Sequence, residues 1–324
     1  MRLKKIISLI LLIIILIGVI YLMFKTDNIN KYEDNSKPTV VVTTFSSYDF
    51  VRQIAKDKVN LIFLLGPGID SHGFEPGAQD IIQIENADLF IYVGGTLEPW
   101  STKVVENLPK EVKTLRLIDS IELLEEIKID GTIDSHNHVH SENKEIDERE
   151  YDEHIWTSLE NATKMIDFIE SGLSNIDKEN ESFYKENAEN YKNKINGVKN
   201  EIQEIVDNSK RKRLVFGDKM PMLYFIEEFG LEVSAAFNGC AEETVPTSSQ
   251  VAYLVDLINK ENIPVVLYIE LSNGKVAKTL SEETGAKMMQ IQTLHNISKE
   301  DFENGETYVS LMKRNAEVLK QALN

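Results

Sequence analysis

Residues 64–80 read LLGPGIDSHGFEPGAQD, and this stretch decides how the rest of the chain is interpreted. The apolar run Val59–Leu65 has the length and composition of a buried β-strand. Gly66–Gly68 ends that strand, and Glu75-Pro76 looks like the start of a helix. His72 therefore lies in the turn after a strand's carboxyl end, where open α/β folds place ligand-binding groups. A single histidine in such a turn is more often a surface residue, so the spacing of its neighbours matters.

That spacing resembles one protein family closely. The matching positions are Pro67, Gly68, Asp70, His72, Glu75-Pro76, Asp80, Ala87-Asp88, Gly94-Gly95 and Leu97-Glu98-Pro99-Trp100. They resemble the metal-binding solute-binding proteins of zinc and manganese ABC importers, the cluster A-I type, and the resemblance extends over nearly everything from Thr39 to Asn324. In that family the histidine that corresponds to His72 is the first metal ligand. The resemblance implies the same role for His72.

Composition limits the classes of function. A formal net charge of −18 argues against nucleic-acid binding, which requires basic patches. Hydrophobic residues make up 42% of the chain, enough for real cores, and the length fits two lobes of ordinary size. Cys240 is the only cysteine, so an intrachain disulfide is excluded.

The N-terminus carries a membrane signal. Ile6–Phe24 has no charged residue and would span about 28 Å as a helix, close to the hydrocarbon thickness of a bilayer. The basic residues within positions 1–5 predict a cytoplasmic start and an extracellular remainder. A cleaved signal peptide is the alternative, but no A-x-A site follows. Cys240 lies too far away for the lipid attachment common in the family. We therefore expect an uncleaved anchor, followed by a polar tether over residues 25–38.

Strands alternate with helices after the tether, which predicts a parallel sheet with right-handed crossovers. We expect a first lobe over residues 39–158. Its expected strands are 39–44, 60–65, 89–93 and 114–118, and its expected helices are 46–55, 76–86, 97–108 and 120–127.

Two histidine motifs follow. His136, His138 and His140 alternate in the polar loop 129–151, which could collect metal weakly or simply be a solvated loop. Zinc-binding members of the family often have a histidine-rich loop at this place. Immediately afterwards, Asp152-Glu153-His154-Ile155-Trp156 resembles the family's D-x-H-x-W, which supplies the second histidine ligand. A histidine beside tryptophan could otherwise serve packing alone.

Residues 159–210 have a helical period with a break at Asp177–Asn180, and we expect them to connect the lobes rigidly and to permit only small closure motions. The second lobe should occupy residues 211–324. Its expected strands are 213–216, 230–237, 264–269 and 287–292, and its expected helices are 248–259, 276–284 and 307–323.

The second lobe departs from the family at its ligand positions. Asp218 follows the strand where the family usually has histidine or glutamate as third ligand; a helix N-cap is its alternative role. The family's fourth-ligand aspartate has no counterpart, since residues 272–274 are Ser-Asn-Gly. Cys240, Glu270 or water could fill that place. His295 follows the last strand and is interpreted as a loop residue.

Together these features predict a protein that binds a zinc ion between two α/β lobes. Manganese is the alternative ion. The resemblance implies a monomer that is anchored at the extracellular face of the cell membrane. It would pass the ion to an ABC permease driven by a separate ATPase. The chain has no G-x-x-x-x-G-K-[ST] loop of its own. A metallohydrolase is an alternative, but H-E-x-x-H is absent, so we expect no enzyme. A metal-binding surface adhesin with the same fold is another alternative.

Overall fold

The computed structural model describes residues 36–69, 73–127, 151–237 and 246–324. Within these ranges no helix is both long and apolar enough to cross a membrane. The predicted anchor, Ile6–Phe24, lies outside the described residues.

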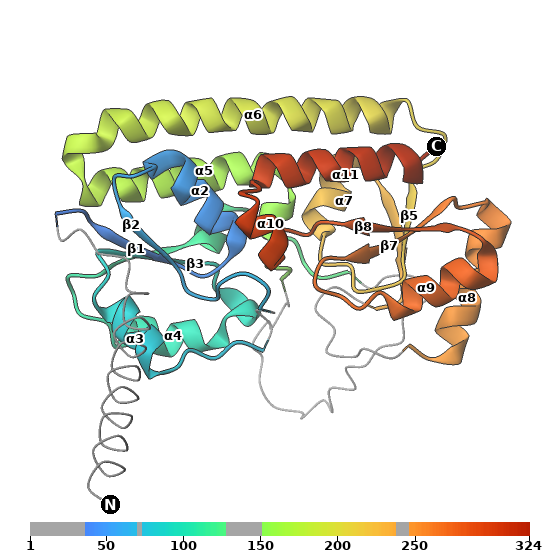
Figure 1. The fold of residues 1–324 in the computed structure, drawn as a ribbon, viewed down its shortest axis with the longest axis horizontal. Helices are drawn as coiled ribbons and strands as arrows, with labels where there is room; N and C mark the ends of the chain where they lie inside the picture. Colours follow the sequence, from blue (N-terminus) through green and yellow to red (C-terminus); the bar gives the residue numbers. More distant parts are fainter. Residues whose placement is uncertain (1–35, 70–72, 128–150, 238–245) are drawn as a thin grey trace, which may run out of the picture. The chain divides into compact units, whose positions relative to one another are not determined.

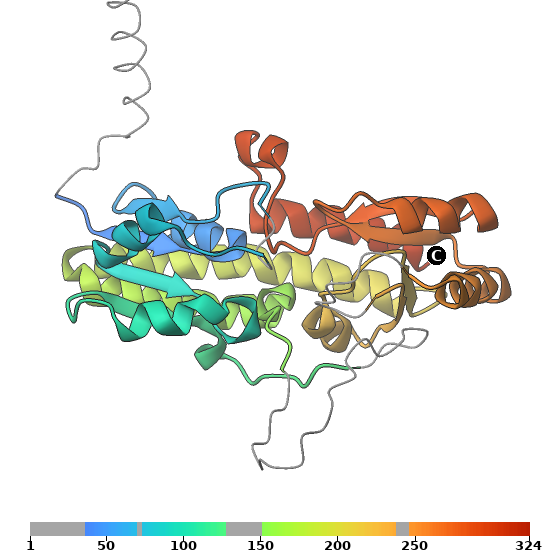
Figure 2. The same ribbon diagram turned by 90° about the horizontal axis from the view of Figure 1, so that it is seen from below.

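Two four-stranded parallel sheets form the framework (Figures 1 and 2). The first has the order β2-β1-β3-β4 and the second the order β6-β5-β7-β8, so both sheets repeat one topology. All neighbouring strands run parallel, as predicted from the alternation of strands and helices. The strands are β1 (Thr39–Val42), β2 (Asn60–Phe63), β3 (Leu89–Tyr92), β4 (Lys113–Arg116), β5 (Arg213–Phe216), β6 (Glu232–Ala235), β7 (Val265–Ile269) and β8 (Lys287–Ile291).

Helices cover both faces of the first sheet because successive strand residues point to opposite sides. Val40 and Val42 belong to the largest hydrophobic core, together with α2 (Phe45–Ala55) and α5 (Leu159–Ile176). Val41, between them, points to the other face and packs with residues of α3 (Ala78–Glu85) and α4 (Pro99–Glu106).

The second sheet is built in the same way. Leu214 and Phe216 face the largest core, with α7 (Leu223–Phe229) and α11 (Tyr308–Ala322). Val215 points to the opposite face, where α8 (Ser248–Glu261) and α9 (Lys275–Thr284) pack. Each sheet is thus a layer between helices, which makes the chain an α/β protein as predicted.

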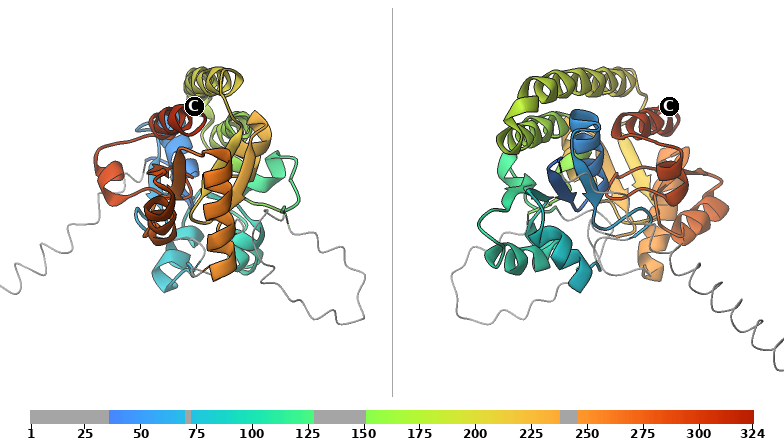
Figure 3. Two further views of the ribbon diagram at one scale, coloured as in Figure 1. Left: turned by 90° about the vertical axis from the view of Figure 1, so that its right-hand side faces the viewer. Right: turned by 60° about the vertical axis from the view of Figure 1, so that its left-hand side comes forward.

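A helical hairpin links the two sheets. α5 ends at Ile176, the 3-10 turn η5 (Lys178–Asn180) follows, and α6 (Glu181–Asp207) runs back, so the predicted break is confirmed. α6 lies along α5 and α11 in Figures 1 and 3, in agreement with its contacts to both helices. Its buried side chains recur every three or four residues and form one apolar stripe: Tyr184, Ala188, Tyr191, Ile195, Val198, Ile202 and Val206.

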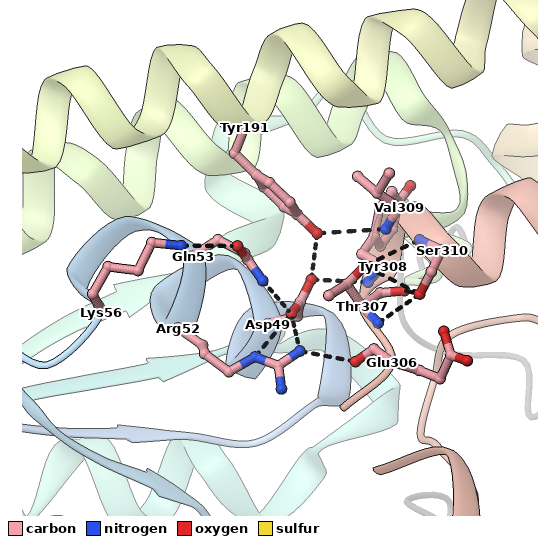
Figure 4. A network of polar contacts seen from close by, with 10 residues as sticks. All are labelled: Asp49, Arg52, Gln53, Lys56, Tyr191, Glu306, Thr307, Tyr308, Val309 and Ser310. Atoms are coloured by element: carbon pink, nitrogen blue, oxygen red, sulfur yellow. Dashed lines mark hydrogen bonds and ion pairs between the residues drawn. The ribbon is translucent and has the colours of Figure 1, made fainter. Parts of the chain in front are cut away.

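Asp49 joins three of these helices through a buried polar network (Figure 4). Its carboxylate in α2 accepts hydrogen bonds from the hydroxyl of Tyr191 in α6 and from the Tyr308 amide, 2.8 Å away, at the start of α11. Arg52 adds an ion pair from the next turn of α2 at 2.5 Å. Desolvation and the Asp49 charge raise the pKa of Tyr191, so its hydroxyl keeps the proton that it donates. The network therefore fixes α2 and α11 on the long helix.

The prediction of a helix over residues 120–127 is wrong. Only the 3-10 turn η3 (Leu117–Ser120) forms there. Beyond it, the Leu124 amide donates to the Tyr224 hydroxyl at 3.1 Å, and the Leu124 carbonyl accepts from the Asp152 amide at 3.0 Å. The backbone groups that a helix would use are therefore engaged by distant residues. Two short helices were not predicted: α7 and α10 (Lys299–Glu303).

Candidate metal site

Two of the candidate ligands, Asp218 and Glu270, lie just after the carboxyl ends of strands. In each sheet the strand order reverses between the first and third strands in sequence, β1 and β3 or β5 and β7. Open α/β sheets bind ligands in the crevice outside such a switch point. Asp218 follows β5 and Glu270 follows β7, so both lie beside the switch point of the second sheet.

His154 is fully buried and is held by Asp152. One oxygen of the Asp152 carboxylate, Oδ1, lies 2.8 Å from the His154 amide nitrogen and 3.1 Å from ring nitrogen Nδ1. A carboxylate that accepts from Nδ1–H fixes the ring's tautomer and leaves Nε2 as the nitrogen with a lone pair. Histidine metal ligands are oriented by such carboxylates in many proteins. His154 therefore has the kind of carboxylate partner that orients many histidine metal ligands.

Trp156 packs against this histidine and connects it to the second lobe. Its ring lies edge-on to His154, with centroids 5.4 Å apart. Its indole nitrogen Nε1 donates to the Thr293 carbonyl at 2.9 Å, in the segment after β8. The Tyr308 hydroxyl donates to the Trp156 carbonyl at 2.7 Å, so the tryptophan is fixed at both ends. The aspartate of the D-x-H-x-W motif thus holds the histidine, and its tryptophan contacts the segment that follows β8 of the second sheet.

Glu153, which precedes His154 in the sequence, and Glu98 are both buried. Glu153 accepts from the Thr96 amide and hydroxyl, while Glu98 accepts from the amides of Val93 and Gly94 at 2.7 and 3.0 Å. Burial raises the pKa of Glu98 to about 7, and the nearby Glu153 charge acts in the same direction. Glu98 belongs to the L-E-x-W motif, so that motif's acidic residue closes the turn after β3.

Asp218 and Glu270 have different surroundings. The Asp218 carboxylate accepts from its neighbour's amide, Lys219 N at 2.9 Å, and from Ile269 N at 3.4 Å. Both oxygens of Glu270 are engaged by Thr293, Oε2 with the amide at 2.7 Å and Oε1 with the hydroxyl at 2.6 Å. Burial raises the pKa of Glu270. Its contacts are those of a residue that holds the segment after β8, which weighs against Glu270 as a fourth ligand.

The residue before Asp218 is Gly217, and there is no room for a side chain at this position. A Cβ atom at this position would lie 2.4 Å from the Cα of Ala277 in α9, far inside van der Waals contact. The absence of a side chain lets α9 approach the end of β5. The close packing fixes the backbone from which Asp218 projects.

His295 lies in the loop after β8, as interpreted from the sequence, but this loop reaches the candidate site. Its ring centroid is 5.4 Å from that of His154 and 5.2 Å from that of Trp156. The neighbouring Asn296 side chain donates to the carbonyls of Gly66 and Ile69, at 2.9 and 2.5 Å, in the segment that precedes His72. The sequence could have indicated this position for His295. The residue follows a strand that ends at the same sheet edge as the strands before Asp218 and Glu270.

The remaining predicted site residues lie outside the described residues: His72, Cys240 and the loop histidines His136, His138 and His140. Within the described part of the chain, no group of three or more His, Cys, Asp or Glu side chains is arranged to hold a metal ion. Among the described residues, the structure therefore brings His154 beside His295.

Two parallel sheets of matching topology, connected through a long helix, define a two-lobed binding protein. The family model described as "Zinc-uptake complex component A periplasmic" matches residues 40–322. The chain belongs to this family, the metal-binding solute-binding proteins of ABC importers of the cluster A-I type, as its motifs indicated. This is a family of solute-binding proteins and not of enzymes.

Two relatives and one solved structure illustrate the likeness. The zinc-binding lipoprotein AdcA of Streptococcus pneumoniae is 28% identical over 90% of this chain and 57% of its own length. The chain thus spans little more than half of that relative. The high-affinity zinc uptake system protein ZnuA of Bacillus subtilis is 28% identical over 88% of this chain and 87% of its own. The Zn(II)-bound ZnuA-like domain of S. pneumoniae AdcA aligns with a TM-score of 0.73 at 27% identity, covering 89% of this chain and 99% of that domain.

Proposed function

We propose that this protein captures zinc outside the membrane and delivers it to an ABC importer. The observation that carries the proposal is the buried Asp152–His154 pair, in which a carboxylate orients an imidazole for metal binding. Family membership and the zinc-binding names of the relatives support the same ion. The ion is the cargo of this protein, and the chain's own work is to bind and release it.

The proposed ligands are His72 and His154 from the first lobe and Asp218 from the second. His72 rests on its sequence motif, and Asp218 on its place after β5 at the switch point. Cys240 remains a candidate for the fourth position, with water as the alternative. A coordination sphere that joins both lobes would couple ion binding to small lobe movements, which the long α6 helix permits.

Zinc is favoured over manganese by the type of donor. Neutral imidazole suits zinc, and the affinity of nitrogen-containing sites rises from manganese to zinc. Asp218 is compatible with either ion and does not decide. A Cys240 thiolate would strengthen the preference for zinc, because sulfur is a soft ligand.

The regions outside the described residues complete the proposal. Ile6–Phe24 would anchor the protein, with the binding lobes on the extracellular side. The histidines His136, His138 and His140 would assist capture without forming the tight site. The protein would act as a monomer with a permease and a separate ATPase as partners.

Zinc uptake by cells tests this function. Cells that depend on this protein and its permease should accumulate radioactive zinc, and His154→Ala should abolish accumulation at low zinc concentration. Asp119→Asn is the matched control and should retain uptake. Asp119 is an exposed carboxylate that pairs with Arg116 and lies outside the D-x-H-x-W motif. Unchanged uptake in His154→Ala would contradict the proposal. If cells that lack the protein adhered less but took up zinc normally, the adhesin alternative would be favoured.

A further inference from the structure

Tyr224 connects the second lobe to the backbone beside His154. It lies in α7, which follows the Asp218 segment, and its side chain is buried. The Tyr224 hydroxyl donates to the Asp152 carbonyl at 2.7 Å and accepts from the Leu124 amide at 3.1 Å. Burial raises the pKa of Tyr224, so the hydroxyl keeps the proton that it donates. A side chain of the second lobe therefore holds the residue that orients His154.

The backbone of Asp152 is held on both sides. Its carbonyl accepts from Tyr224, and its amide donates to the Leu124 carbonyl at 3.0 Å. Fixed peptide groups leave the Asp152 side chain few positions, and Oδ1 lies within hydrogen-bond distance of the His154 amide and of its ring nitrogen Nδ1. The Tyr224 hydroxyl can therefore act on the imidazole through Asp152.

The same helix also holds the chain after His154. Glu228 follows Tyr224 by four residues in α7, so both side chains project from one face of that helix. The Glu228 carboxylate accepts from the first two amides of α5, at 2.7 and 3.1 Å. Between these points α7 contacts the 3-10 turn η4 (Ile155–Thr157). The segment that carries His154 is thus fixed to α7 on both sides.

We propose that Tyr224 is a positioning residue for zinc binding, which keeps the Asp152 carboxylate in the place where it orients His154. This inference rests on the proposed function and deepens it. Because α7 follows Asp218, one short helix ties the candidate ligands of both lobes together. An imidazole that is already oriented loses less freedom when it binds the ion, which increases the affinity.

The zinc affinity of full-length Tyr224→Phe, measured by chelator competition, tests the proposal. The variant should bind zinc about 10-fold more weakly, at the lower end of the range for loss of an outer-shell partner. Tyr184→Phe is the matched control and should keep wild-type affinity. It also loses a buried hydroxyl, one that donates to Asp177 at 2.6 Å at the opposite end of α5.

A double-mutant cycle separates positioning from a general loosening of the fold. Adding Tyr224→Phe to Asp152→Asn should change the zinc affinity by less than about twofold, because the carboxylate to be positioned is already gone. The ring ¹⁵N signals of His154 in the metal-free protein give a second readout at about pH 8, where an ordinary imidazole is neutral. Wild type should show the tautomer with hydrogen on Nδ1, and Tyr224→Phe should show a mixture.

Several results would overturn the inference. Wild-type affinity or an unchanged His154 tautomer in Tyr224→Phe would mean that the hydroxyl only stabilises the fold, as would an equal loss of affinity in Tyr184→Phe. A full further loss in the Asp152→Asn background would mean that Tyr224 does not act through Asp152. If Tyr224→Phe does not fold, Tyr224→Met takes its place, because its flexible side chain fills irregular space without a hydroxyl. If wild type itself fails to bind zinc tightly, the proposed function fails instead.

Discussion

Asp152 holds His154 at two points, with Oδ1 2.8 Å from the backbone nitrogen and 3.1 Å from ring nitrogen Nδ1. A short loop thereby fixes both the place and the tautomer of a buried imidazole. Asp152→Asn should weaken zinc binding by about 10- to 100-fold, because an amide orients the ring less firmly and makes it a weaker base. Chelator competition measures this change.

The stoichiometry should remain unchanged in Asp152→Asn, because no ligand is removed. Asp119→Asn serves as the control for loss of one negative charge, since Asp119 pairs with Arg116 on the surface. Equal affinity in Asp152→Asn and wild type would show that the carboxylate does not support the metal ligand.

Tryptophan fluorescence should report zinc binding. The chain has two tryptophans, of which Trp156 lies against His154 and Trp100 packs among Phe74 and Phe90. Zinc should change the emission of wild type and Trp100→Phe, and the change should disappear in Trp156→Phe. A signal that is lost with Trp100 instead would place the ion elsewhere.

The Asp49 network should stabilise the fold without affecting the ion. Tyr191→Phe removes the hydroxyl that donates to Asp49 from α6 and leaves a buried acceptor with one partner fewer. We expect a loss of about 1–3 kcal/mol in the free energy of unfolding, measured by urea denaturation. Zinc stoichiometry should stay at the wild-type value. Tyr253→Phe, at an exposed tyrosine of α8, is the control and should change stability little.

Glu98 should give the apoprotein a pH-dependent stability. Its pKa is raised from 4.5 to about 7 in the folded state, chiefly by burial. Between these values the folded chain binds a proton that the unfolded chain has lost, so stability falls as pH rises through this window and levels off above it. The loss should be on the order of 3 kcal/mol.

Glu98→Gln should flatten that dependence, because a neutral amide can still accept from the amides of Val93 and Gly94. Thermal unfolding at pH 5, 6, 7 and 8 tests this, with the exposed Glu106→Gln as control. A slope in Glu98→Gln as steep as in wild type would assign the pH dependence to another group.

The sequence predicted the sheets well because local signals and tertiary structure agree. Arg213–Phe216 was predicted at its observed bounds, since its apolar residues alternate between two covered faces. The break before α6 was also visible in the polar residues at Asp177–Asn180. The helix predicted over residues 120–127 does not form, because the backbone of Leu124 is hydrogen-bonded to Tyr224 and Asp152, which are distant along the chain.

The candidate site was harder to predict because it is assembled from separate segments. His154 was found through its neighbours in one motif, D-x-H-x-W, which the structure explains through Asp152 and Trp156. His295 has no such local motif. Its position depends on Leu294 in the left-handed region and on the bonds from Thr293 to Glu270, and neither is readable from spacing along the chain.

The most direct test of the central claim is a competition titration of the metal-free full-length protein with zinc and manganese, with His72→Ala and His154→Ala measured alongside. The account predicts one tightly bound zinc ion per wild-type chain, weaker binding of manganese, and loss of the tight site in both variants. Tighter binding of manganese than zinc, or wild-type zinc affinity in either variant, would contradict it.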